Sequence, residues 1–262
     1  MSRFWKRAIA LAVFVVVLGV AFVLLGQWQL DRLDQRRAKN DVILQHEQSP
    51  PKPYDQVFGP VITDADQWQR VVLTGTFDAS QQFQVRYRYN NSRPGYEVVT
   101  PLRTTRGDVV LVDRGFIDLP SGQQIPDVLP PPPPGEVTVV GHVRRNENGK
   151  PQAINPVNNQ VRLINAPAIS AVLPYPVMDG WVAALEVTPP QQPQFQTLAL
   201  PEISDGPHFW YAMQWFLFAL IGVTGLVVFV RSDIRERRAR RTPGSPVTAS
   251  AARTPGAGPD TP

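Results

Sequence analysis

The chain has 262 residues, carries a formal net charge of +4 and contains no cysteine. The lack of cysteine excludes a disulfide framework, an iron–sulfur cluster and thiolate sites for zinc or copper. The three histidines, His46, His142 and His208, are too few to favour a metal site built from a histidine cluster.

The positive charge lies at the two ends of the chain. Residues 1–7 contribute +3 and the segment after Val230 contributes +4, whereas the region between them has 16 Lys and Arg against 19 Asp and Glu, a net of −3. Basic residues beside apolar segments interact with anionic lipid. The charge pattern therefore favours a membrane protein and disfavours nucleic-acid binding.

The first expected element is a membrane-spanning helix. Ala8 to Leu25 is a run of 18 apolar or glycine residues, long enough to cross the hydrocarbon core of a bilayer. A cleaved signal peptide is the alternative, but its apolar region is shorter and ends at a small-residue cleavage site. We therefore expect an uncleaved anchor over residues 8–28, continued by a charged helix over Asp31–Gln45 that ends before the prolines at 50–53.

Residues 29–206 are expected to form a mainly-β (α+β) domain. Six short runs rich in β-branched and aromatic residues are separated by turn residues; they are Trp68–Leu73, Gln82–Tyr89, Glu97–Arg103, Val109–Phe116, Val137–Arg144 and Trp181–Val187. This spacing favours an antiparallel barrel or a sandwich. The strict polar–apolar alternation of Gln82–Tyr89 predicts a strand with one wet face. A short helix is expected over Ala166–Leu173, and Pro130–Pro134 predicts an extended polyproline segment.

A second membrane-spanning helix is expected over residues 207–230, because no formal charge occurs between Tyr211 and Val230. Six arginines follow this helix within 11 residues, and cationic flanks favour the cytoplasmic side. Two spans place both ends of the chain on one side, so residues 1–7 and 231–262 are expected in the cytoplasm and the domain outside it. The tail from Thr242 to Pro262 is rich in Pro, Gly, Ala and Thr and is expected to be disordered.

The segment Pro207–Phe216 places a histidine among aromatic residues where the second span begins. A neutral imidazole at this depth lies within reach of a membrane-soluble ligand and still near water. For Trp210, Tyr211 and Trp215 the alternative is an interfacial aromatic belt. For His208 the alternative is a ring whose hydrogen bonds are satisfied within the protein.

The sequence contains no motif of a known enzyme class, and we expect a protein without catalytic activity. It has no G-x-S-x-G elbow, no glycine-rich phosphate loop and no H-E-x-x-H. The compact polar constellation Asp113-Arg114-Gly115-Phe116 lies at the end of an expected strand. It is either a rigid docking surface for a partner protein or an anionic group, or an Asp/Arg pair beside a glycine that tolerates a β-bulge. The acidic residues of the domain are scattered and are expected on solvated faces.

Several motifs, in order along the chain, resemble the Surfeit-locus protein family in a bacterial form, over about Leu24 to Asp233. The Trp-Gln-x-x-Arg signature after the first span and the His-x-x-Tyr-Ala-x-Gln-Trp-Phe signature before the second are both present. The segments that carry the resemblance are Gly26–Arg32, Val71–Phe77, Gly95–Leu102, Val112–Phe116 and Pro207–Phe216. The family usually has Asn where Asp113 stands and Trp where Phe116 stands.

The resemblance implies an assembly factor for haem-copper cytochrome c oxidase in the bacterial cell membrane. Its partners would be subunit I of the oxidase, other assembly factors and the lipid bilayer, and it would act when haem a is inserted into subunit I or stabilised there. A transient haem a would have His208 as axial ligand, since imidazole commonly ligates haem iron. Around that ligand, the expected contacts are ring stacking, room beside the histidine and pairing with a propionate, from Trp28, Tyr211, Trp215, Gly26 and Arg32.

Two other functions remain open at this stage. One is a two-pass membrane scaffold that presents the β domain without binding haem. The other is an extracytoplasmic module that binds lipid or cell-wall pieces.

The two spans are expected to pack directly against each other. Small residues recur every seven positions on both helices, at Ala12, Gly19 and Gly26 and at Ala212 and Ala219, and such a face lets two backbones approach closely. In an antiparallel pair, residues 26–28 would then lie level with residues 208–212.

Overall fold

The computed structural model describes residues 3–119, 122–193 and 195–241. The first two residues and the tail 242–262, for which the sequence predicts disorder, lie outside the described residues. The chain divides into two compact units. We call residues 3–33 with 206–241 the helix pair and residues 34–205 the β domain.

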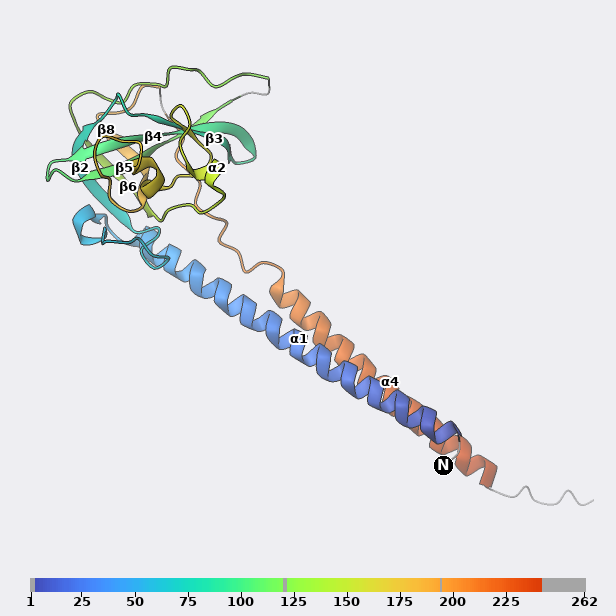
Figure 1. Ribbon diagram of the computed structural model, residues 1–262. Coiled ribbons are helices and arrows are strands. Elements are labelled where there is room, and N and C mark those ends of the chain that lie inside the picture. The colour runs from blue at the N-terminus through green and yellow to red at the C-terminus, as the bar shows by residue number, and fades with distance from the viewer. Residues whose placement is uncertain (1–2, 120–121, 194, 242–262) are drawn as a thin grey trace, which may run out of the picture. The chain divides into compact units, whose positions relative to one another are not determined.

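Two long helices, α1 (Arg3–Gln48) and α4 (His208–Arg241), begin and end the described chain (Figure 1). In the part of the chain that the structure describes, these are the two helices long and apolar enough to cross a membrane. Their most apolar stretches are not buried within the protein, as expected for side chains that face lipid. Helix α1 ends two residues before Pro50, which confirms the predicted charged continuation beyond the first span.

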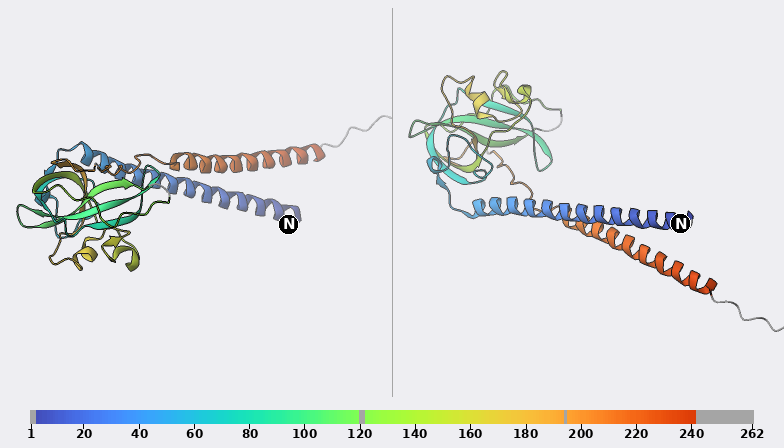
Figure 2. Two further views of the ribbon diagram at one scale, coloured as in Figure 1. Left: turned by 90° about the horizontal axis from the view of Figure 1, so that it is seen from above. Right: turned by 60° about the horizontal axis from the view of Figure 1, so that its bottom comes forward.

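The helices of the pair contact each other near the start of α4. Gly26 lies directly under the ring of Phe216, Ala212 is fully buried, and Phe22 stacks on Trp215 with ring centroids 5.5 Å apart. Farther along, a side chain at Gly19 would meet nothing within 4 Å, although one at Gly222 would still meet Val15 at 3.7 Å. Toward the N-terminus of α1 the helices diverge (Figure 2). The predicted contact through small residues is therefore present at Gly26 and Ala212 and absent at Gly19.

The β domain contains a closed five-stranded barrel. The sheet order is β1-β2-β6-β8-β5-β4-β3-β7, and an additional β2–β4 pairing closes a ring of β2, β6, β8, β5 and β4. The pairs in this ring are antiparallel except β5–β8, which is parallel. The strands are β1 (Lys52–Pro53), β2 (Arg70–Phe77), β3 (Phe83–Asn90), β4 (Arg93–Thr104), β5 (Val109–Asp118), β6 (Glu136–Arg144), β7 (Gln160–Val161) and β8 (Trp181–Thr188).

Six of these strands match the six predicted runs, and the barrel is the observed form of the predicted barrel or sandwich. Three short helical elements lie between the strands: η1 (Tyr54–Gln56), α2 (Pro151–Ile154) and α3 (Ala166–Ser170). Helix α3 begins where predicted because the side chain of Asn165 accepts a hydrogen bond from the backbone N–H of Ala168.

The central strand β5 is buried on both faces. Val110 and Val112 belong to one apolar cluster with Leu73 and Val139, while Leu111 points to a second cluster around Trp181. Alternate residues of a strand face opposite sides, so an uninterrupted apolar run is what a strand between two cores requires. Each of these fully buried side chains contributes roughly 1.5–3 kcal/mol.

Strand β3 departs from the predicted alternation. The pairing of β3 with β4 shifts register between Val85 and Arg88, and Tyr87 lies within the shift at φ 61°. A bulge of this kind reverses the faces of the residues that follow. Tyr87 and Tyr89 are therefore 62% and 70% exposed, whereas the side chain of Arg88 is only 17% exposed. The prediction of one regular wet face was wrong, because Gln84 on the expected wet face is only 6% exposed and the faces reverse beyond Val85.

The part of α1 within the β domain is held by specific polar contacts. Arg36 Nε donates to the carbonyl of Ser204 over 2.7 Å, and Arg37 pairs with Asp205 at 2.6 Å. These contacts bind α1 to the segment that leads back to α4.

Candidate functional site

The imidazole of His208, the first residue of α4, meets a glutamine of α1. Nδ1 of His208 lies 2.8 Å from Oε1 of Gln29. An amide oxygen only accepts hydrogen bonds, so this contact calls for a hydrogen on Nδ1, and in a neutral ring the lone pair is then on Nε2. Among the residues that the structure describes, none bonds to Nε2. The ring is therefore held at one nitrogen and available at the other.

The face of α4 that begins with His208 is directed at α1. Ala212 is fully buried and Trp215 stacks on Phe22, one and two turns beyond the histidine. Ala212 and Trp215 therefore lie with His208 on the face that meets α1, whereas Tyr211 is 48% exposed. The arrangement agrees with the expectation that the outer end of the first span lies level with residues 208–212.

Two of the predicted ring contacts, Trp28 and Tyr211, are about half exposed, whereas the space expected beside Gly26 is filled. Trp28 is 49% exposed, with the guanidinium carbon of Arg32 5.5 Å from its ring centroid, and Tyr211 is 48% exposed. Gly26 was expected to leave room beside His208, but a side chain there would meet the ring of Phe216 at 2.5 Å. The space over Gly26 is filled by Phe216 and is not open.

These residues fit a haem group in chemical type. A neutral imidazole with one nitrogen held by an acceptor is the usual form of a metal-ligating histidine. Arg32 offers a guanidinium for a carboxylate, and Trp28 and Tyr211 offer exposed ring faces. A groove of about 670 Å³ between the apolar segments of the helices is separate from this site, because its lining, which includes Val16, Val20, Val23, Leu220 and Val223, contains none of these residues.

The other two histidines have partners within the β domain. His46 Nδ1 lies 2.8 Å from the carbonyl of Gln67, and His142 Nε2 lies 2.6 Å from Glu47. Burial lowers the pKa of His142, so its neutral ring donates to the Glu47 carboxylate. No group of three or more His, Cys, Asp or Glu able to hold a metal ion is found in the described ranges.

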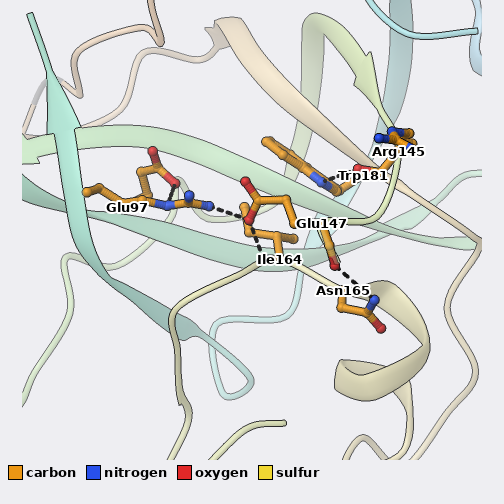
Figure 3. Close-up of polar contacts among 7 residues, drawn as sticks. Glu97, Arg145, Glu147, Ile164, Asn165 and Trp181 are labelled. Carbon is orange, nitrogen blue, oxygen red and sulfur yellow. Dashed lines mark hydrogen bonds and ion pairs between the residues drawn. The ribbon is translucent and has the colours of Figure 1, made fainter. Parts of the chain in front are cut away.

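A second polar assembly within the β domain includes Glu97 and Glu147 (Figure 3), and Arg88 pairs with both carboxylates. Arg88 Nε lies 2.7 Å from Glu97 Oε2, an ion pair outside hydrogen-bond geometry, and its Nη2 donates to Glu147 Oε2 over 2.7 Å. The Glu147 carboxylate also accepts the backbone N–H of Ile164, and its backbone carbonyl accepts from Asn165. We call Arg88, Glu97, Asp113, Arg144 and Glu147 the charge cluster.

The charge cluster contains three carboxyl groups and two guanidinium groups. Asp113 is fully buried, and burial raises its pKa to about 7. Burial, together with the nearby carboxyl of Asp113, raises the pKa of Glu97 well above its usual value. One bound proton among the carboxyls balances the cluster. Burial also lowers the pKa of Arg144, which stacks over the ring of Trp68 at 3.8 Å.

The segment Asp113–Phe116 is part of this interior and not a docking surface. Asp113, Arg114 and Phe116 are at most 1% exposed. Gly115 has φ 121° and lies in a register shift between β4 and β5, which confirms the alternative of a glycine that permits a bulge. Asp113 accepts the N–H of Gly115 over 3.0 Å.

Arg114 binds the polyproline segment instead of pairing with Asp113. Its Nη1 and Nη2 donate to the carbonyls of Pro130 and Pro131 over 2.8 and 2.9 Å. Its guanidinium also lies 4.6 Å from the ring centroid of Phe195. The predicted extended segment is therefore packed onto the barrel.

Two sets of polar residues were not identified from the sequence. Gln29 could have been singled out as the glutamine of the Trp-Gln-x-x-Arg signature. Nothing in the sequence, however, indicates that it contacts His208, which lies 179 positions away. Arg88 and Glu97 were expected on solvated faces, and the structure corrects this, since their side chains are 17% and 6% exposed. Their burial follows from the bulge in β3 and from pairing between distant segments.

The comparisons agree with the resemblance noted in the sequence. The model of the SURF1 family matches residues 16–220. Uncharacterized SURF1-like proteins of Mycobacterium bovis and Mycobacterium tuberculosis are each 29% identical over 244 residues, which cover 91% of this chain and 88% of theirs. The cytochrome oxidase assembly protein SHY1 of Saccharomyces cerevisiae is 32% identical over 112 residues, 39% of this chain and 28% of that protein.

Proposed function

This chain belongs to the SURF1 family, and on that premise we propose that it assists assembly of a haem-copper cytochrome c oxidase. Its specific task is to receive haem a at the membrane and to support its insertion into subunit I, or its stabilisation there. The name of the yeast relative supports the role in oxidase assembly. The role toward haem rests on this chain's own residues.

The single observation that carries the proposal is the state of His208. Nδ1 is bonded to Gln29, and no described residue occupies Nε2, at the end of a helix apolar enough to cross a membrane. His208 Nε2 would hold the iron of a bound haem, because neutral imidazole is a common ligand of haem iron. Trp28 and Tyr211 would contact the macrocycle, and Arg32 would pair with a propionate.

The cellular arrangement follows from charge. The arginines after the second span favour a cytoplasmic C-terminus, so both ends lie in the cytoplasm and the β domain faces outward in the bacterial cell membrane. His208 then lies at the outer edge of the bilayer, close to the oxidase subunit I that receives the haem. Other assembly factors and lipid are the remaining partners.

Replacement of His208 tests the proposal. Full-length wild type, His208→Ala and the control His46→Ala are purified in detergent and titrated with haem a, followed by absorbance. His208→Ala should lose the haem spectrum and lower the yield of active oxidase in cells, while it remains membrane-inserted. His46→Ala should behave as wild type, because His46 belongs to the β domain. If His208→Ala keeps both the haem spectrum and full oxidase activity, the protein acts as a scaffold.

The scaffold alternative has one observation in its favour. Tyr87 and Tyr89 project from β3 with most of their surface exposed, and exposed tyrosines are common where proteins bind one another. A scaffold would co-purify with oxidase subunits in the His208→Ala form as well as in the wild type.

A further inference from the structure

We propose that Gln29 is a positioning residue for His208, and that its side-chain carbonyl selects the imidazole tautomer that leaves Nε2 free to bind iron. The inference rests on the proposed haem function and extends it to a residue that does not touch the haem. It is carried by the 2.8 Å contact between Gln29 Oε1 and His208 Nδ1.

The chemistry of the contact decides which nitrogen is available. A neutral imidazole carries its hydrogen on either Nδ1 or Nε2, and only the nitrogen without hydrogen binds a metal. An acceptor facing Nδ1 stabilises the form with hydrogen there. In metal sites such an acceptor also fixes the orientation of the ring and raises the basicity of the other nitrogen.

The contact is the last member of a regular helix–helix register. Phe22 of α1 stacks on Trp215, Gly26 packs under Phe216, and Gln29 meets His208. These α1 residues follow one another at i, i+4 and i+7, so they share one face. The earlier α1 residues Phe22 and Gly26 meet Trp215 and Phe216, and the later residue Gln29 meets His208 at the start of α4, as antiparallel helices require. The position of Gln29 is therefore set by packing on its own helix and is not an accident of a flexible side chain.

A neutral amide at position 29 suits a protein that must release its haem to an acceptor protein. A carboxylate in the place of Gln29 would draw the Nδ1 hydrogen more strongly and increase electron donation to the iron. It would also put a charge near the hydrocarbon, which is costly. The amide orients the ring with a weaker effect on the strength of the iron–nitrogen bond, which favours release to an acceptor protein.

Gln29→Leu is the principal test, with Gln27→Leu as its control. Both variants replace a glutamine of the same helix by the same apolar residue, but Gln27 is exposed two positions earlier and lines the apolar groove. Full-length protein in detergent is titrated with haem a, and the iron–histidine stretching frequency of the ferrous complex is recorded by resonance Raman spectroscopy. Gln29→Leu should weaken haem binding about 10–100-fold and lower that frequency, whereas Gln27→Leu should leave both unchanged.

Gln29→Glu separates positioning from mere packing. Because a carboxylate is a stronger acceptor, this variant should raise the stretching frequency and lower the reduction potential of the haem, opposite to Gln29→Leu. A purely structural role would change occupancy in both variants without moving the frequency of the haem that remains bound, and that result would overturn the inference.

The outcomes for His208 and Gln29 are distinguishable. If His208→Ala loses haem while Gln29→Leu binds it with unchanged affinity and frequency, the positioning role is wrong and the proposed function stands. If His208→Ala keeps the haem spectrum of the wild type, the proposed function fails, and the positioning role with it.

Discussion

The charge cluster of the β domain and the histidine of the helix pair are both polar groups in apolar surroundings, but their bonding differs. Arg88 pairs with the carboxylates of Glu97 and Glu147, so the cation on which the charge cluster is built has its partners supplied by the fold. His208 has one partner, Gln29, and one ring nitrogen that no described residue binds. A polar network that closes on itself supports the fold, whereas an open ligand position at the membrane edge is suited to binding.

The largest expected loss of folding stability is at Arg88. Arg88→Leu leaves Glu97 and Glu147 without their cation inside the β domain, and breaking a buried ion pair from one side costs about 3–5 kcal/mol. Denaturant unfolding and hydrogen exchange of the strand amides in the full-length protein measure the loss. Arg93→Leu is the control, because Arg93 pairs with Asp118 at the surface with a side chain 57% exposed. Equal stability of the two variants would show that the cluster does not hold the barrel.

Asp113→Asn tests the charge cluster by removing the buried carboxyl whose pKa is raised. The pKa of Asp113 in the fold is about 7, above its unfolded value, so its contribution to stability is full below about pH 4 and is lost as pH rises through 7. The asparagine keeps an acceptor for the N–H of Gly115 and does not titrate. We therefore expect the stability of Asp113→Asn relative to wild type to rise by about 2–3 kcal/mol between pH 5 and pH 8.

Asp113→Ala is the matched control for that experiment. It removes the same carboxyl but also the acceptor of the Gly115 N–H, which costs about 1–3 kcal/mol for a buried donor. Asp113→Ala should therefore be less stable than Asp113→Asn at every pH. A pH profile of Asp113→Asn that parallels the wild type would show that Asp113 does not carry the proton.

Gly26→Leu tests the packing of the helix pair, and its expected effect on stability is smaller. Any side chain at Gly26 displaces the ring of Phe216, and overpacking of this kind costs about 1–3 kcal/mol. The displaced helices would part where Gln29 meets His208, so haem titration should show weaker binding. Gly19→Leu is the control, because a side chain there meets nothing within 4 Å. Equal haem binding by the two variants would contradict the packing described here.

The sequence predicted the parts of this fold that depend on local pattern. The β-rich run Val109–Phe116 predicted strand β5, and the uncharged stretches of α1 and α4 predicted two long apolar helices, because each of these patterns is contained in consecutive residues. The strands β1 and β7 are two residues each, too short to produce a pattern.

What the sequence could not predict depends on contacts between distant residues. The alternation of β3 fails at Tyr87 because a bulge, invisible in the pattern, reverses its faces. For Asp113 the sequence left a docking surface and a residue beside a bulge glycine open, because its cationic neighbours, Arg88 and Arg144, come from other strands. His208 was recognised by its setting, whereas Gln29, its partner, became evident only once the antiparallel register of the helices was known.

The smallest expected change is in the stability of the β domain after His208→Ala. His208 belongs to the helix pair, and its described hydrogen bond goes to Gln29 of the same unit, so the strand amides of β2 to β8 should keep their hydrogen-exchange protection within about 0.5 kcal/mol. The same preparation should lose the haem absorbance. Loss of ligand without loss of fold is the reverse of Arg88→Leu, which should lose fold first. If His208→Ala unprotects the barrel strands, the histidine supports structure as the charge cluster does, and the distinction between the two regions fails.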